Sequence, residues 1–194
     1  GLALENVENL TIICDNAEFI YCNKATDNTD SAGTSVQSTF FKFTGCKNLT
    51  VIDGNFDGKN KVSQIITLIN CPNANIDNVN ISNAGNALSA TAAGINFLRN
   101  CSNFNVRNAK ISGIKAGTVG PDGYIHSFGI GVTSAGNGYS QHGNIVNVRI
   151  NDIDGYNSGD VKPDGDGIYL IERPTDDFSG DGYINISRCE IKGC

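Results

Sequence analysis

Short stretches in which apolar and polar residues alternate recur along the chain. In one of them Phe41 and Phe43 are separated by the polar Lys42. An alternation of period two is typical of a β-strand with one buried face. Equivalent apolar pairs are found at five places: Phe41/Phe43, Ile66/Leu68, Ile95/Phe97, Ile130/Val132 and Ile168/Leu170. The pattern therefore predicts a recurring strand whose apolar pair faces a core.

A second repeated segment follows each pair. Segments that begin at Cys46, Cys71 and Cys101 align without gaps, and each has an aliphatic residue five places later. This anchor position extends to the series Ile12, Val51, Ile76, Val106, Val148 and Ile186. Five places further comes a second inward series: Ala17, Phe56, Ile81, Ile111, Ile153 and Ile191. The repeat averages about 35 residues, so we expect a stack of similar units that share one core.

Asp or Asn stands just after several anchors, where a turn would separate two strands: Asp53, Asn78, Asn108 and Asn151. These residues tolerate positive φ and form turns. Each repeat is therefore predicted to hold three short strands, giving an all-β parallel coil of about six turns. A leucine-rich repeat is disfavoured because its repeats run roughly 20–29 residues. A doubly wound α/β fold is disfavoured because no helical pattern separates the strands.

The composition agrees with this interpretation and excludes several classes of protein. Glycine (23 residues) and asparagine (26 residues) together favour turns over helices. A net charge of −6 argues against a nucleic-acid surface, and no apolar run is long enough for membrane insertion. We expect residues 1–194 to form one domain, and the ends at Gly1 and Cys194 suggest a piece of a longer protein.

The seven cysteines cannot all pair within one chain, because their number is odd. No C-x-x-C motif is present, so a zinc site is not expected. The repeated positions of Cys46, Cys71 and Cys101 predict buried free thiols. Such thiols imply that the chain folds in a reducing compartment, wherever it later works.

The Asn-rich turns, the recurring Cys and aliphatic residues, and the segment Asp166-Gly-Ile-Tyr-Leu together resemble the pectin-lyase-like superfamily. The resemblance covers nearly the whole chain and implies a right-handed parallel β-helix with three strands per coil. The irregular insertions and free cysteines are most similar to a bacteriophage tailspike. That likeness implies a homotrimer on the virion tail or outside the cell, folded in host cytoplasm, which acts on a bacterial surface or capsular polysaccharide.

Departures from the repeat length suggest where a site would lie. The spacing from paired strand to anchor is 8 or 9 residues in early repeats but 16 from Val132 to Val148 and from Leu170 to Ile186. The two insertions, 134–143 and 172–182, would stack as one wall. The opposite corner is also enlarged, at 112–128 and 154–167. We therefore expect a trough over the strands 130–132 and 168–170, where loops on a rigid scaffold carry function.

Acidic side chains are frequent around this trough, and glycoside hydrolysis needs two carboxyls. Glu172 is the candidate general acid, and Asp166 or Asp164 is the candidate ionised partner. Residues that could bind substrate complete the site: Tyr169, Arg173, Asp177, His142, Tyr139 and His126. Hydrolysis is favoured over lyase chemistry because few basic groups are available to abstract a proton.

Purely structural roles for the same residues are alternatives. Asp-Gly pairs such as Asp164-Gly165 are ordinary turn formers, and Glu172 beside Arg173 could be a surface charge pair. Four aspartates, Asp160, Asp164, Asp166 and Asp176, are an alternative oxygen-ligand set for Ca²⁺; otherwise no metal or cofactor is expected. The alternative function is a non-catalytic carbohydrate-binding adhesin or a structural β-helix shaft. A depolymerase releases product, whereas a binding module does not.

Overall fold

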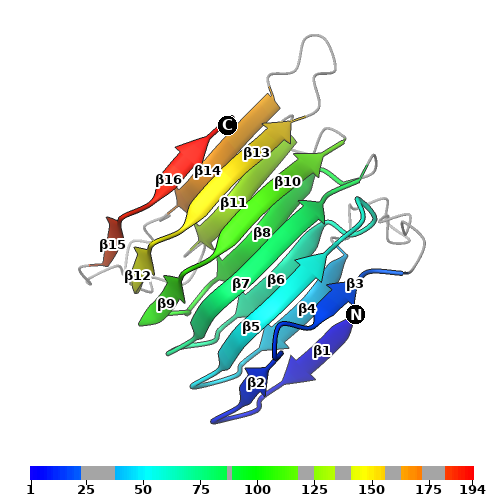
Figure 1. The fold of residues 1–194 in the computed structure, drawn as a ribbon. Helices are drawn as coiled ribbons and strands as arrows, with labels where there is room; N and C mark the ends of the chain where they lie inside the picture. Colours follow the sequence, from blue (N-terminus) through cyan, green and yellow to red (C-terminus); the bar gives the residue numbers. More distant parts are fainter. Residues whose placement is uncertain (23–37, 87–88, 118–124, 134–140, 156–162, 172–181) are drawn as a thin grey trace, which may run out of the picture.

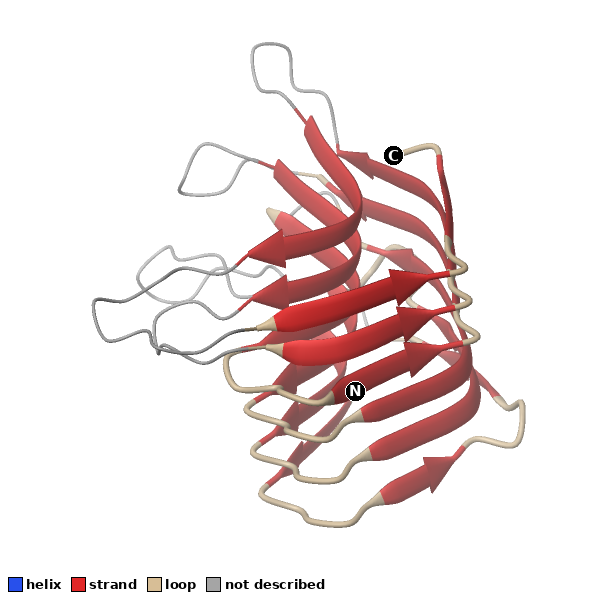
Figure 2. Ribbon diagram, turned by 90° about the vertical axis from the view of Figure 1, so that its left-hand side faces the viewer, coloured by secondary structure: helices blue, strands red, loops and turns tan. Residues whose placement is uncertain are grey.

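The computed structural model describes residues 1–22, 38–86, 89–117, 125–133, 141–155, 163–171 and 182–194, with backbone alone at 125, 155 and 163–164. Every regular element in these ranges is a β-strand, and every pairing between strands is parallel. The described residues include no helix able to cross a bilayer. The chain is all-β, with two stacked parallel sheets in a parallel β-helix-like arrangement (Figures 1 and 2).

The first sheet holds the strands with the apolar pairs. Its order is β1 (Leu2–Glu5), β4 (Thr39–Thr44), β6 (Gln64–Ile69), β8 (Thr91–Leu98), β11 (Ile125–Thr133) and β14 (Pro163–Ile171). The register aligns Phe41, Ile66, Ile95, Ile130 and Ile168 in one row. The pairing of these five strands, including Val132 opposite Leu170, confirms the prediction.

The second sheet has ten strands. They correspond to the predicted second and third strands of each repeat. Its strands are β2 (Thr11–Ile13), β3 (Glu18–Ile20), β5 (Thr50–Asp57), β7 (Asn75–Ala84), β9 (Phe104–Arg107), β10 (Lys110–Ala116), β12 (His142–Val146), β13 (Arg149–Gly155), β15 (Tyr183–Ser187) and β16 (Glu190–Lys192). The predicted second and third strands are separate in most repeats but run together in β5 and β7. In β5 the turn residue Asp53 has φ 59° inside the continuous strand, so it bends the strand rather than ending it.

The predicted register was wrong in two parts of the second sheet. Ile145, not Val148, pairs with Val106 and Ile186. Similarly, Ile150, not Ile153, pairs with Ile111 and Ile191, and Phe19, not Ala17, pairs with Phe56. In the repeat that contains Ile145 and Ile150, the turn residue is Asn147 (φ 56°) rather than Asn151. Val148 and Ile153 are buried as well as Ile145 and Ile150. The hydrophobic pattern alone therefore does not tell which member of each couple pairs with the neighbouring strands.

The core lies between the two sheets and is continuous along the stack. Phe97 of the first sheet stacks on Phe104 of the second, with ring centroids 4.3 Å apart. Cys46, Cys71 and Cys101 are free and fully buried, as predicted. The Cys71 backbone N–H donates to Cys101 Sγ at 3.3 Å, so these cysteines form a column along the stack.

Asparagine side chains form similar columns at the turns. Asn73 Nδ2 donates to Asn48 Oδ1 at 2.9 Å, and Asn48 Nδ2 donates to Asn9 Oδ1 at 2.8 Å. All three residues have positive φ. The high asparagine content is thus explained by two needs of the turn, a left-handed backbone and an amide that bonds to its neighbours above and below.

Candidate functional site

The outer face of the first sheet carries polar side chains that alternate with the buried pairs. One row in register contains Lys42, Thr67, Asn96, Gly131 and Tyr169. Thr67 and Asn96 are only 3% exposed. Gln64 Oε1 accepts hydrogen bonds from Thr67 Oγ1 (2.6 Å) and from Asn96 Nδ2 (3.1 Å). This part of the face is therefore a buried polar network rather than solvated surface.

A pocket of about 170 Å³ opens on this face where β8, β11 and β14 lie side by side. We call it the outer-face pocket, and it is lined by Thr91, Asn96, Leu98, His126, Phe128, Thr133 and Tyr169. Asn96 Oδ1 is buried and accepts no hydrogen bond from the described residues. A buried acceptor without a donor is costly, so this atom is suited to a donor supplied by a ligand.

Aromatic rings form one side of the outer-face pocket. Phe128 stacks on Tyr169 with ring centroids 5.4 Å apart and planes 13° apart, and the His126 ring lies 6.1 Å from Tyr169. Gly131 makes room for this arrangement, because a Cβ there would lie 2.4 Å from the Phe128 ring and 3.0 Å from Asn96 Oδ1. The absence of a side chain at Gly131 lets Phe128 lie across the strand beside Asn96.

The structure brings together two of the residues singled out from the sequence, Tyr169 and His126. Asp166 lies on the same strand as Tyr169, opposite Phe128 in register, but it does not line the outer-face pocket. Burial raises the pKa of the Cys194 thiol, and the charge of Asp166 adds a weaker effect in the same direction. Its strand places Asp166 next to the pocket rather than in it.

The other predicted site residues are elsewhere or undescribed. His142 lies on β12 in the second sheet, where its ring is 5.0 Å from that of Tyr183. Asp164 is described only by its backbone, which pairs with His126. Glu172, Arg173, Asp177 and Tyr139 lie outside the described residues. Within the described part of the chain, no group of three His, Cys, Asp or Glu side chains could hold a metal ion.

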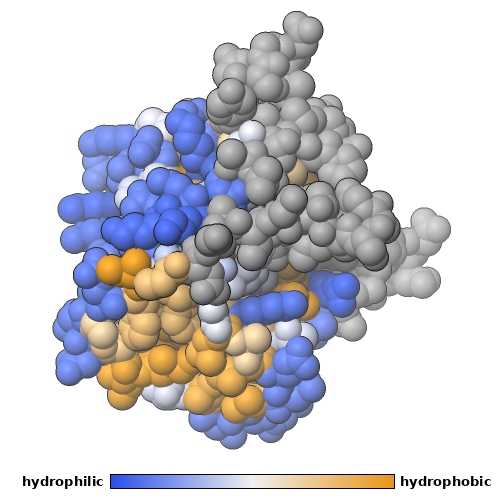
Figure 3. All heavy atoms as spheres, turned by 90° about the vertical axis from the view of Figure 1, so that its right-hand side faces the viewer, coloured by the Kyte–Doolittle hydropathy of each residue, from blue (hydrophilic) through white to orange (hydrophobic). Residues whose placement is uncertain are grey.

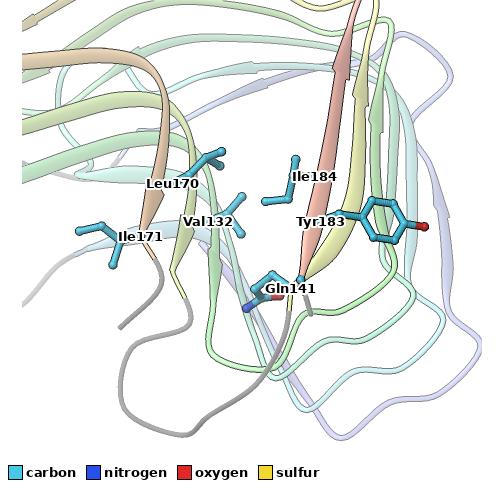
Figure 4. A pocket seen from close by; sticks show the side chains of 7 residues that line it. Val132, Gln141, Leu170, Ile171, Tyr183 and Ile184 are labelled. Carbon is cyan, nitrogen blue, oxygen red and sulfur yellow. The ribbon is translucent and has the colours of Figure 1, made fainter. Parts of the chain in front are cut away.

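A second pocket, of about 250 Å³, lies between the sheets at their C-terminal ends (Figure 4). Leu170, Val132 and Ile184 point into it, whereas Tyr183 points away. The Gln141 side-chain amide nitrogen donates to the backbone oxygen of Arg99 at its rim. This pocket is the open end of the apolar core, so its chemistry differs from that of the outer-face pocket.

Sequence reasoning missed Asn96 and Phe128. Asn96 stands between Ile95 and Phe97, so the alternation already placed it on the outer face. Its burial depends on Gln64, which is 32 residues away, and no local pattern reveals that contact. Phe128 was assigned to an enlarged corner, whereas it belongs to β11.

Comparisons with known proteins give no identification: no protein-family model matches the chain, and no curated protein or solved structure is significantly similar to it. The fold and the outer-face pocket therefore carry the functional argument.

Proposed function

We propose that the outer-face pocket binds one sugar unit of a bacterial surface or capsular polysaccharide, and that the chain is a tailspike-like depolymerase. The observation that carries the proposal is Asn96 Oδ1, which is buried and has no hydrogen-bond donor among the described residues, beside the stacked Phe128 and Tyr169 rings. A sugar ring offers hydroxyl donors on its edge and an apolar face that packs on an aromatic ring. The pocket is smaller than the roughly 300–1,000 Å³ of typical ligand sites, which suits one ring of a polymer.

The proposed architecture is the right-handed parallel β-helix that the resemblance implies, with three strands per coil and about six coils. The all-parallel pairing and the regular rows of apolar residues support it. In such a coil the outer face of the first sheet is flat along the stack, so a polymer could contact several neighbouring strands at once. The homotrimer and the virion or extracellular location remain part of this proposal.

For the reaction we retain hydrolysis with Glu172 as general acid and Asp166 or Asp164 as the ionised carboxylate. Asp166 is three residues from Tyr169 on β14, so a sugar on Tyr169 would lie near that end of the strand. Arg173, Asp177, Tyr139 and His142 are proposed as further contacts to the polymer. His126 already lines the outer-face pocket.

Binding is tested by titrating purified capsular polysaccharides and O-antigens against the chain and against Y169A and N96A variants. We expect each substitution to weaken binding about tenfold, the equivalent of roughly 1.4 kcal/mol. Tyr183→Ala is the matched control, because Tyr183 is an exposed tyrosine on the other sheet (67% exposed). Equal binding by Y169A, N96A and Y183A, all folded by circular dichroism, contradicts the assignment of the pocket.

Activity is tested by incubating a bound polysaccharide with the chain and measuring new reducing ends. E172Q is expected to abolish their release, and a product that absorbs in the ultraviolet would indicate a lyase instead. Binding without any product supports the second candidate, a non-catalytic binding module or shaft. One observation favours that candidate: among the described residues, none that lines the outer-face pocket is acidic.

A further inference from the structure

The outer side of the second sheet carries a pocket that is separate from the outer-face pocket of the first sheet. It has a volume of about 270 Å³, and we call it the basic pocket. It is lined by Asn108, Ala109, Lys110, Asn147 and Arg149. Hydrophilic residues cover this side of the molecule, which forms the left margin of Figure 3. The pocket lies in the interior of the sheet, because β10 pairs with β7 and β13, and β13 pairs with β10 and β16.

Two cationic side chains stand next to each other at the basic pocket. The register pairs Lys110 of β10 with Arg149 of β13, and both residues are exposed. Neighbouring strands lie about 4.8 Å apart, and like charges directly opposite each other are destabilising. An anion that contacts both side chains would replace this repulsion by two attractions.

Lys110 has no counter-ion of its own in the described part of the chain. Its neighbour on the other side is the neutral Asn80, and it forms no ion pair with a described residue. Lys115, five residues further along β10, is different: its Nζ lies 2.7 Å from Asp154 Oδ2, and Asp152 also acts on it. The two lysines share a strand, but only Lys110 retains its charge for a ligand.

Two amide side chains complete the lining of the basic pocket. Asn108 and Asn147 have positive φ (53° and 56°) and belong to one of the columns at the turns. Asn147 Nδ2 donates to Asn108 Oδ1 at 2.7 Å, and Asn108 Nδ2 donates to Asp77 Oδ1 at 2.8 Å. An amide nitrogen carries two hydrogens, and the column uses one of each. The second hydrogen is therefore a neutral donor beside the two cations.

Two acidic side chains lie near the basic pocket without lining it. Glu190 Oε2 is 3.6 Å from Arg149 Nε, longer than the roughly 2.7–2.9 Å of a charge-assisted hydrogen bond, and Glu190 is paired with Lys192. Asp77 stands in register opposite Arg107. Each acid thus has another cation beside it, and together they leave the positive charge of the pocket only partly compensated.

We propose that the basic pocket binds an oxyanion, which is the carboxylate, sulfate or phosphate group of a small molecule or of a polymer. The planar guanidinium of Arg149 matches such groups with two parallel hydrogen bonds, and Lys110 adds a point charge. The net charge of the chain is −6, so binding depends on these local groups rather than on the overall field. The proposal does not rest on the function proposed for the outer-face pocket, because the two pockets lie on different sheets.

The first experiment titrates sodium sulfate into the isotope-labelled chain at constant ionic strength, with sodium chloride as the balance, and follows the backbone amide signals by NMR. We expect saturable shifts at residues 108–110 and 147–149. K110Q and R149Q should each weaken sulfate binding about fivefold. K115Q is the matched control, because it removes the same charge from the same strand about 16 Å away, and it should change binding less than twofold. Shifts that do not saturate, or equal weakening by K110Q and K115Q, overturn the proposal.

A second set of titrations identifies what carries the anion. Acetate, glucuronate and glucose are compared by the same amide shifts. Acetate and glucuronate should both shift residues 108–110 and 147–149, whereas neutral glucose should not. Tighter binding of glucuronate than of acetate indicates an acidic sugar, and equal binding indicates that the bare anion is the ligand. Glucose that shifts the same amides as strongly as glucuronate contradicts an oxyanion site.

Two further variants guard against a misleading loss of binding. E190Q removes the carboxylate near Arg149 and should strengthen sulfate binding about twofold, so weaker binding by this variant argues against the proposal. Y169A alters the outer-face pocket and should leave sulfate binding unchanged. A loss of sulfate binding in Y169A, with the fold intact by circular dichroism, would place the anion at the other pocket and overturn the assignment. Polysaccharide binding that fails in every variant would contradict only the function proposed for the outer-face pocket.

Discussion

At the scale of single residues, asparagine does two things that no other residue type does equally well here. At Asn73 the backbone has φ 60° and the side chain donates to Asn48. At Asn80 the side chain makes the same kind of bond, to Asn55 at 2.6 Å, but φ is not positive. The two positions separate the contribution of the side-chain bond from that of the left-handed backbone.

We predict that N73A lowers the free energy of unfolding by about 1–3 kcal/mol, because Ala loses the hydrogen bond and is strained at positive φ. N80A should lose only about 0.5–1.5 kcal/mol, since it forfeits a bond alone. N73G keeps the backbone geometry and should fall between wild type and N73A. Urea unfolding monitored by circular dichroism measures all three, and equal losses in N73A and N80A would contradict the argument.

The buried cysteines should not react with alkylating reagents in the folded chain. Burial raises the pKa of Cys71 to about 11 and that of Cys101 to about 12, so almost no thiolate is present at pH 8, and the thiolate is the reactive form. Iodoacetamide at pH 8 should label Cys22 and Cys194 in the native chain. Cys71 and Cys101 should be labelled only after unfolding, as mass spectrometry of the digests can show. Labelling of Cys101 as fast as Cys22 would contradict the described burial.

At the scale of strands, the sequence predicts which strands exist better than it predicts their register. The pairs in the first sheet were found because Phe41, Ile66, Ile95, Ile130 and Ile168 each begin a clear alternation. In the second sheet the predicted register was wrong at Val148 and at Ile153, where Ile145 and Ile150 pair instead. Both members of each couple are buried and only three residues apart. Backbone pairing decides between them, and local hydrophobicity contains no information about it.

The end of β5 offers a pH-dependent test of how neighbouring strands hold each other. Burial raises the pKa of Asp57, but hydrogen bonds from Lys59 and from Asn83 on β7 outweigh it, so the pKa is lowered from its usual 3.8. A carboxyl whose pKa is lowered in the folded state stabilises that state above its unfolded pKa. The contribution is lost as the pH falls through the lower, folded pKa.

We therefore predict that D57N is less stable than wild type by about 1 kcal/mol at pH 7. This difference should persist down to about pH 4 and then shrink at lower pH, because the wild-type carboxyl becomes protonated. Urea titrations of both proteins between pH 7 and pH 2.5 measure it. N83A is the matched control, since it removes the neutral donor and leaves the Lys59 ion pair. A difference independent of pH would show that the charge of Asp57 is not what matters.

The candidate site could be predicted only in part for a related reason. Tyr169 and His126 were singled out because they stand on or beside strands expected to form the trough. The outer-face pocket also needs Asn96 from β8 and Phe128 from β11, and Gly131 between them. These residues meet only after three strands pair in the right register, so their joint role is a property of the assembled sheet.

At the scale of the whole molecule, burial increases from the edges of the stack toward its centre. Phe97 and Phe104 in the middle are fully buried and stack on each other, whereas Ile186 and Ile191 at the C-terminal edge remain 43% and 44% exposed. In a stack where each unit contacts only its neighbours, stability is approximately a sum over units and interfaces. The outer strands have one interface and the inner strands have two, so unfolding should begin at the edges.

This gradient predicts different costs for the same substitution at two places. Phe97→Ala should lower the free energy of unfolding by about 3–5 kcal/mol, because it leaves a cavity in a closed core. Ile186→Ala should cost about 1 kcal/mol, since nearly half of that side chain is already in contact with water. Hydrogen exchange should show the same order, with slow amides in β6 to β10 and fast ones in β2, β3, β15 and β16. If β15 and β16 exchange as slowly as β8 in a dilute sample shown by sedimentation to be monomeric, the stack unfolds as one cooperative unit and the gradient has no energetic meaning.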